Sequence, residues 1–267
     1  MTGMLVWSGM GSAATPSMPV DVIFNEPAED QSWESRGWYD YAEGGNTLPL
    51  VADGAIPSSS NSIQYAWALN AQKPTGTGTI RLALTPTDNI YVSYYVKYSS
   101  GYVGSQQAFH PHEFQMLTNK SSAYSGFNNS ELSLLIEQSG LIPRLAFANP
   151  ANVYGVYYDG TAPITTNVWH RVEAFFKLNT FSGSVGNNDG IVRYWLDGVL
   201  QVEATDVMMR DGSANTDMLI NQFAIPPYIG SGSPVAQTMW IDELTIGTEN
   251  PGASGTTPNP PSSVSAN

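Results

Sequence analysis

Cysteine is absent from the 267 residues, and basic side chains are scarce. The chain therefore has no disulfide framework, no thiolate zinc site and no cysteine nucleophile. Lysine and arginine number 10 against 23 aspartates and glutamates, which gives a formal charge of −13 at pH 7. A surface that binds nucleic acid needs clustered basic side chains, so this balance argues against a nucleic-acid partner.

Long apolar runs are also missing from the sequence. No stretch approaches the ~18 uninterrupted apolar residues of a membrane span, so we expect no membrane insertion. Charged residues make up 12% of the chain, about half of the usual ~25%. The hydrophobic share of 42%, with 11% aromatic residues, is nevertheless enough to bury a core, which excludes disorder for most of the chain.

The two ends of the chain differ in composition from its middle. Residues 1–20 hold a short apolar patch followed by small residues and prolines, without the basic and apolar regions of a full signal peptide. Residues 248–267 are rich in Pro, Ser, Gly and Thr and are typical of a linker to further modules. We expect an N-terminal tail over 1–20, one domain over 21–247 and a linker over 248–267, in a secreted or cell-surface protein.

Apolar residues in the middle of the chain recur at every second position, which is the period of a β-strand. The pattern is clearest in 91–98, 131–137, 169–178, 191–196 and 238–246. Asp197-Gly198 is typical of a two-residue hairpin turn into 199–202. Only 205–210 and 215–222 are compatible with a helical turn. The sequence predicts an all-β fold, a two-sheet antiparallel β-sandwich or jelly roll.

Several short motifs in this region are similar to those of a known family. Val168-Trp-His-Arg-Val-Glu173 is followed by Lys177-Leu-Asn-Thr180, Asn188-Asp-Gly-Ile191 and Tyr194-Trp-Leu-Asp-Gly198. This succession resembles the core of concanavalin-A-like polysaccharide lyases of the alginate and glucuronan lyase type. His110-Pro-His-Glu-Phe-Gln115 stands where we associate a Gly-Lys-Pro-Gly-like stretch with that family. The resemblance implies a concanavalin-A-like jelly roll and, as an activity, β-elimination at a uronate.

A curved sandwich of this kind binds its ligand in a concave groove, on the sheet face where side chains alternate with core residues. Strand phase predicts a shared groove for Tyr95, Lys97, Glu113, Gln115, Arg171, Glu173, Phe175, Arg193 and Trp195. Arginine, carboxylate and tryptophan side chains together suit a polysaccharide, because they supply donors, acceptors and a flat apolar surface. The alternative is a ladder of cross-strand ion pairs on an ordinary solvated face.

A lyase acting in this groove removes the proton α to a uronate carboxyl, which requires a group that neutralises the carboxylate and a base. The candidates are Arg171, Arg193 and Gln115 for the first role and His112, Tyr95 or Lys97 for the second. Strand phase puts His112 with Phe114 and Met116, which predicts a buried histidine. The net charge of −13 would repel a polyanion unless the arginines create a local positive field.

Other functions fit the same face. A glycoside hydrolase needs two carboxylates beside the bond, and Glu113 with Glu173 is the pair predicted to share the groove. The compact Glu-x-Asp-x-x-Glu signature of sandwich glucanases is missing. A non-catalytic carbohydrate-binding module and a structural or adhesive surface domain are the remaining alternatives.

Oxygen ligands near both ends of the domain suggest a structural calcium ion. Asn25-Glu26 follows the apolar run 22–24, and Asp242 lies in the last predicted strand. Carbohydrate-binding sandwiches resemble this arrangement, which implies that these three residues hold calcium, an ion that prefers carboxylate and carbonyl oxygens. We expect no organic cofactor.

Overall fold

The structure is a computed structural model that describes residues 22–39, 47–105, 112–120, 132–149 and 152–248. For a few strand residues (112, 133, 148, 149 and 152–155) it describes the backbone alone. The predicted tail over 1–20 and nearly all of the predicted linker lie outside the described residues.

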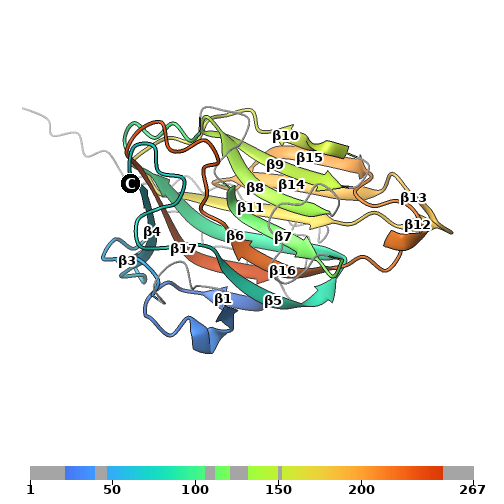
Figure 1. The fold of residues 1–267 in the computed structure, drawn as a ribbon, viewed down its shortest axis with the longest axis horizontal. Helices are drawn as coiled ribbons and strands as arrows, with labels where there is room; N and C mark the ends of the chain where they lie inside the picture. The colour runs from blue at the N-terminus through green and yellow to red at the C-terminus, as the bar shows by residue number, and fades with distance from the viewer. Residues whose placement is uncertain (1–21, 40–46, 106–111, 121–131, 150–151, 249–267) are drawn as a thin grey trace, which may run out of the picture.

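Two antiparallel sheets form the protein, and Figure 1 shows them stacked as two layers. The eight-stranded sheet has the order β15 (Val199–Val207), β14 (Gly190–Leu196), β11 (His170–Lys177), β6 (Asn89–Tyr98), β17 (Gln237–Gly247), β4 (Ser62–Trp67) and β3 (Leu50–Val51), with β1 (Val22–Glu26) also paired to β17. The seven-stranded sheet has the order β10 (Asn152–Asp159), β9 (Ile142–Asn149), β8 (Ser133–Ser139), β7 (His112–Thr118), β16 (Ile220–Ile225), β5 (Ile80–Thr87) and β2 (Trp38–Tyr39).

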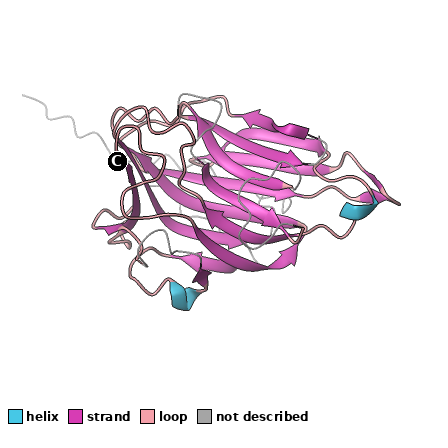
Figure 2. Cartoon of the chain, in the orientation of Figure 1, coloured by secondary structure: helices cyan, strands magenta, loops and turns pink. Residues whose placement is uncertain are grey.

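Helix is almost absent from the described part of the chain. Two short 3₁₀ helices, Glu34–Arg36 and Ser213–Asn215, lie at the periphery of the sandwich, as Figure 2 shows. A small ribbon of β12 (Phe181–Ser182) and β13 (Val185–Gly186) completes the elements. No helix in the described ranges is long and apolar enough to cross a membrane.

The core lies between the sheets and consists of the apolar residues that alternate along each strand. On β6 the inward residues include Val92, Tyr94 and Val96, and on β7 they include Phe114 and Met116. Successive side chains of a strand point to opposite faces, so this alternation buries one face of each sheet against the other. The predicted all-β sandwich is confirmed.

The hairpin prediction is also confirmed, and of the two segments compatible with a helical turn only the second begins with one. Asp197 and Gly198 both have positive φ, 50° and 78°, as a tight turn between β14 and β15 requires. Strand β15 continues to Val207, so 205–207 extend a sheet, whereas 215–219 continue from the 3₁₀ helix Ser213–Asn215 through a turn before β16 begins at Ile220. In the first segment, pairing of β15 with β14 outweighed the weak local preference for a turn.

Candidate functional site

Seven of the predicted groove residues do share one face of the eight-stranded sheet, on the side away from the core. Cross-strand pairs join Glu173 to Trp195 and Phe175 to Arg193 between β11 and β14. Arg171 pairs with Tyr95 and Trp240 with Lys97 through β6. The intervening residues of β11 belong to the core. Strand phase therefore predicted this face correctly.

The charges on this face compensate one another. The Nη2 atom of Arg171 lies 3.1 Å from Oε1 of Glu173, which also accepts a 2.6 Å hydrogen bond from the Tyr91 hydroxyl. Burial and the adjacent Glu173 carboxylate raise the pKa of Tyr91 above its usual range. Arg193 donates from Nε to Glu203 at 2.8 Å. These arginines are therefore engaged by protein carboxylates.

Aromatic side chains complete the same face. Tyr91, Phe175 and Trp195 form a buried cluster separate from the main core. Lys97 forms an ion pair with Asp53. Its Nζ lies 4.8 Å from the ring centroids of both Trp169 and Trp240, which are partly exposed. This second group offers ring surface to solvent, whereas the first does not.

Glu113 and Gln115, in contrast, are not on this face, and the prediction that placed them there is wrong. Both belong to β7 in the seven-stranded sheet. A bulge in the pairing of β7 with β8 falls between His112 and Phe114, so Glu113 is an extra residue. A bulge exchanges the faces of the residues on its two sides.

The Glu113 side chain lies between the two sheets and is fully buried. It accepts hydrogen bonds from the hydroxyls of Tyr94 and Tyr98, which point inward from β6 of the opposite sheet. Burial is the main cause that raises the pKa of Glu113 to about 7, although both tyrosine hydrogen bonds act in the other direction. This carboxyl is a structural group of the interior and cannot touch a polysaccharide.

The hydrolase pair is excluded by the same geometry. Glu113 contacts the inner side of the eight-stranded sheet through Tyr94 and Tyr98, and Glu173 lies on the outer side of that sheet. Two carboxylates on opposite sides of a sheet cannot flank one glycosidic bond.

Gln115 lies on the outer face of the seven-stranded sheet, in one row with Arg81, a residue outside the groove predicted from the sequence. Ala224 of β16 pairs with Gln115 on one side and with Arg81 of β5 on the other. Their neighbours Leu82, Met116 and Phe223 belong to the core, so all three lie on the face away from it. The signal that could have found Arg81 is the alternation in Ile80-Arg-Leu-Ala-Leu84.

Arg81 and Gln115 are polar residues at the centre of a sheet that are nevertheless buried, with exposed fractions of 6% and 4%. Gln222, in the next row of the same face, is equally buried. Polar groups in such positions cost desolvation free energy, and they are typical of binding sites. Neighbouring strands lie about 4.8 Å apart, so the backbones at Arg81 and Gln115, two strands apart, are about 10 Å from each other. Only the methyl group of Ala224 lies between them.

His112 occupies the first position of β7 on this sheet, opposite Glu137. Glu137 alternates with the core residue Ile136 and is paired with Arg144 of β9. Because of the bulge, the backbone register puts His112 in an outward row, where simple strand phase predicted a buried residue. His112 and Gln115 thus belong to one face of β7, although they are three positions apart in the sequence.

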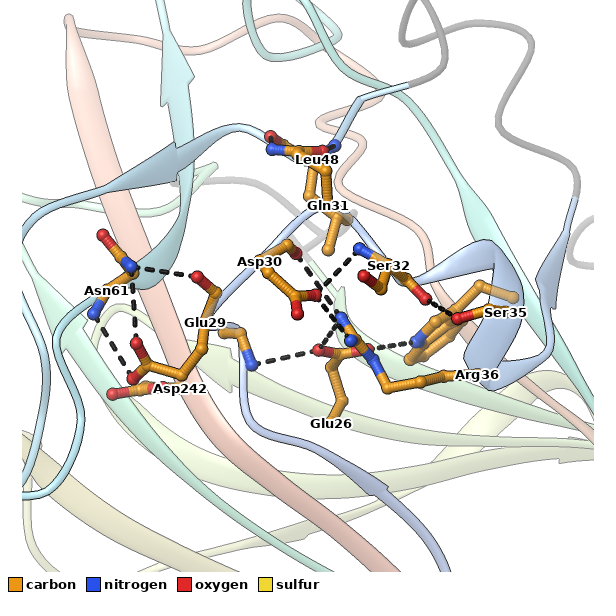
Figure 3. A network of polar contacts seen from close by, with 12 residues as sticks. Glu26, Glu29, Asp30, Gln31, Ser32, Ser35, Arg36, Leu48, Asn61 and Asp242 are labelled. Carbon is orange, nitrogen blue, oxygen red and sulfur yellow. Dashed lines mark hydrogen bonds and ion pairs between the residues drawn. The ribbon is translucent and has the colours of Figure 1, made fainter.

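The predicted calcium ligands at the N-terminal end, Asn25 and Glu26, are engaged by protein donors, and Figure 3 shows the contacts of Glu26. Glu26 accepts hydrogen bonds from Arg36 Nε and Nη2 and from Trp38 Nε1, each at 2.8 Å, and from the Ala28 amide at 3.0 Å. Oδ1 of Asn25 accepts a 2.9 Å hydrogen bond from the hydroxyl of Thr245.

Asp242 is bound separately from Glu26. Its carboxylate accepts hydrogen bonds from the Ala55 amide at 2.8 Å, the Ser59 hydroxyl at 2.6 Å and the Glu243 amide at 2.8 Å. Desolvation by burial raises the pKa of Asp242. Within the described ranges, no group of three or more His, Cys, Asp or Glu side chains is arranged to hold a metal ion. These residues do not fit a shared calcium ion, and the calcium site stays a prediction.

Comparison with known proteins identifies the fold. No family model matches the chain, and no curated protein matches its sequence. Among solved structures, alginate lyase vAL-1 from Chlorella virus gives a TM-score of 0.62 at 15% identity, over 86% of this chain and 100% of that one. The PL-14 alginate lyase from Aplysia kurodai gives 0.60 at 14% identity, over 85% and 99%.

A variant of alginate lyase Aly36B in complex with an alginate tetrasaccharide gives a TM-score of 0.53 at 16% identity, over 71% of this chain and 81% of that one. The predicted resemblance is therefore confirmed for the fold. The chain has the jelly-roll architecture of alginate lyases.

Proposed function

We propose that this β-sandwich binds an acidic polysaccharide across the outer face of its seven-stranded sheet and cleaves it by β-elimination. The observation that carries the proposal is the row formed by Arg81, Ala224 and Gln115. A guanidinium and an amide flank a residue whose side chain is only a methyl group. A ligand bound over Ala224 would therefore be within reach of both polar side chains.

A uronate carboxylate suits these two side chains chemically. Arg81 can donate two parallel hydrogen bonds to a carboxylate, and Gln115 can donate a third from its amide. Neutralising the carboxylate makes the adjacent C–H more acidic. A base then takes that proton, a carbon–carbon double bond forms, and the glycosidic oxygen at the β position leaves. We assign the base to His112, which the register puts on the same face.

The arginines of the eight-stranded sheet have protein carboxylates as partners. Arg171 and Arg193 are engaged by Glu173 and Glu203, so an anionic substrate would have to displace a protein carboxylate. The fold supports the reaction class as well, because the Chlorella virus and Aplysia proteins with this architecture are described as alginate lyases.

The test is incubation of the full chain with a panel of uronate polymers and neutral glycans, following the ultraviolet absorbance of the unsaturated product and the release of reducing ends. Absorbance that rises on a uronate polymer is expected. Arg81→Ala and Gln115→Ala should each lower kcat/KM by about 100-fold, the usual effect of losing one preorganised donor. Arg81→Lys keeps the charge, so its comparison with Arg81→Ala distinguishes loss of catalysis from loss of folding.

Matched controls come from outside the site. Lys120→Ala removes one positive charge from an ion pair with Asp217, and Gln201→Ala removes one amide from β15. Both should leave turnover unchanged. Loss of turnover in Arg171→Ala, with Arg81→Ala unaffected, would move the site to the eight-stranded sheet. Reducing ends without absorbance would replace elimination by hydrolysis.

The second candidate function is non-catalytic glycan binding on the eight-stranded sheet. It is favoured by Trp169 and Trp240, whose partly exposed rings lie on either side of Lys97. Asp53 neutralises that lysine, so a neutral sugar suits this group better than a uronate. Glycan retention without product, lost in Trp240→Ala and kept in Leu69→Ala, would favour this function; Leu69 is an exposed apolar residue.

A further inference from the structure

The bulge in β7 determines which residues of this strand share a face. From Phe114 to Leu117, each residue of β7 pairs with one residue of β8, but His112 pairs with Glu137 and Phe114 with Ile136. His112 and Gln115 are three positions apart, so in a regular strand they would lie on opposite faces. The extra residue Glu113 brings them to the same face.

The bulge is held from the opposite sheet. Tyr94 and Tyr98 lie four positions apart on β6, and each hydroxyl donates to a different oxygen of the Glu113 carboxyl. A buried carboxyl without such partners would cost several kcal/mol. The Tyr94 ring also packs edge-on against Phe114, with centroids 4.5 Å apart. The inward position of Glu113 is therefore stabilised by β6, across the core.

Other titratable groups surround this carboxyl. Tyr102, which follows β6, and Tyr194 on β14 interact with it electrostatically, and each has its pKa raised chiefly by burial. Glu137 on β8 acts on Glu113 as a like charge. The Tyr102 hydroxyl in turn accepts a 3.2 Å hydrogen bond from Nε2 of Gln138. The Glu113 carboxyl is thus the acidic centre of a tyrosine-lined region that spans both sheets.

We propose that Glu113 is a positioning residue, whose bonds to Tyr94 and Tyr98 hold the β7 bulge and so keep His112 on the face of Gln115. This inference rests on the proposed function for its kinetic consequence, but its structural part does not. Without the carboxyl, the hydrogen bonds from Tyr94 and Tyr98 that stabilise the extra residue of β7 are lost. A regular strand would then move the histidine to the inner face.

The test compares Glu113→Gln with Glu113→Leu. Glutamine keeps the shape and two hydrogen-bonding groups, and tyrosine hydroxyls can both donate and accept, so the bulge should persist. Leucine keeps the volume and removes both partners. The structural readout, by NMR, is the set of amide signals of β7 and the pH titration of the His112 imidazole. The chain has three histidines, and the signal that disappears in His112→Gln is assigned to His112. We expect the titration to stay unchanged in Glu113→Gln and to shift in Glu113→Leu.

The kinetic readout separates positioning from general loss of structure. Glu113→Leu should lower kcat by about 100-fold, the effect of a small misplacement of a reacting group. KM should change little, because Arg81 and Gln115 lie beyond the bulge. Should Glu113→Leu fail to fold, Tyr98→Phe removes one of the two bonds and should show the same changes to a smaller extent.

A folded Glu113→Leu variant with wild-type His112 titration and wild-type kcat would overturn the proposal. If the unmodified chain has no turnover on any glycan, the proposed function fails, while the histidine titration still decides whether Glu113 holds the bulge.

Discussion

The hydroxyl of Tyr98 on β6 donates a hydrogen bond to the carboxyl of Glu113 on β7, and this bond crosses the core from one sheet to the other. Both side chains are fully buried. The Tyr94 hydroxyl, four residues earlier on the same strand, also donates to this carboxyl. A largely apolar region between the two sheets thus contains this buried acidic group, which makes the stability of the protein depend on pH.

As the pH rises, the free energy of unfolding of the wild-type protein should fall relative to that of Glu113→Gln. The pKa of this group is about 7 in the folded state, against an ordinary value of 4.5 for a glutamate. Between these values the folded state binds more protons than the unfolded state, so the free energy of unfolding falls as the pH increases. Each pKa unit corresponds to about 1.4 kcal/mol. Urea unfolding at several pH values measures the difference between the two proteins, which would be constant if the carboxyl were ionised in both states.

Removal of Arg36 should destabilise the domain strongly. Its guanidinium binds both oxygens of Glu26, whose side chain is fully buried. Arg36→Met leaves that carboxylate without its counter-charge, and the expected cost is about 3–5 kcal/mol in the free energy of unfolding. Asp30→Asn is the control, because Asp30 also pairs with Arg36 but is 59% exposed. Equal effects of the two substitutions on urea unfolding would contradict this account.

A larger side chain at Ala224 should block the proposed site while leaving its polar groups in place. Leucine at this position would place a bulky apolar group between Arg81 and Gln115, and we expect kcat/KM to fall at least about tenfold, equivalent to 1.4 kcal/mol. Ala83→Leu is the matched control, since Ala83 is exposed and pairs with Gln222 in the next row. Circular dichroism checks that both variants fold. Unchanged kinetics in a folded Ala224→Leu variant would exclude this row as the binding site.

A chelator should leave the thermal midpoint of the protein unchanged. Arg36, Trp38 and a backbone amide already bind the Glu26 oxygens, and Asp242 has three donors of its own. Calorimetry with EDTA, and then with excess calcium, tests this directly. A midpoint that falls with EDTA and recovers with calcium would support the calcium site predicted from the sequence against the arrangement seen in the structure.

Strand phase by itself determined most of the fold and one whole face of it. The alternation in 91–98 and 169–178 puts Tyr95, Arg171 and Glu173 opposite the core, and the structure agrees. The reason is physical: the pleat of a strand sends successive side chains to opposite sides, so apolar spacing is enough to identify the buried face. The resemblance in 168–198 indicated the same jelly roll.

Only the tertiary structure decided which strands share a sheet and where the alternation breaks. Gln115 and Arg81 share a row because β16 lies between β7 and β5. No local sequence pattern shows that these three strands are neighbours. Glu113 turns inward because two tyrosines on the other sheet bind its carboxyl, and that moves His112 to the other face. The spacing of apolar residues along a chain indicates which side of a strand each residue occupies. A bulge depends on partners that are distant in sequence.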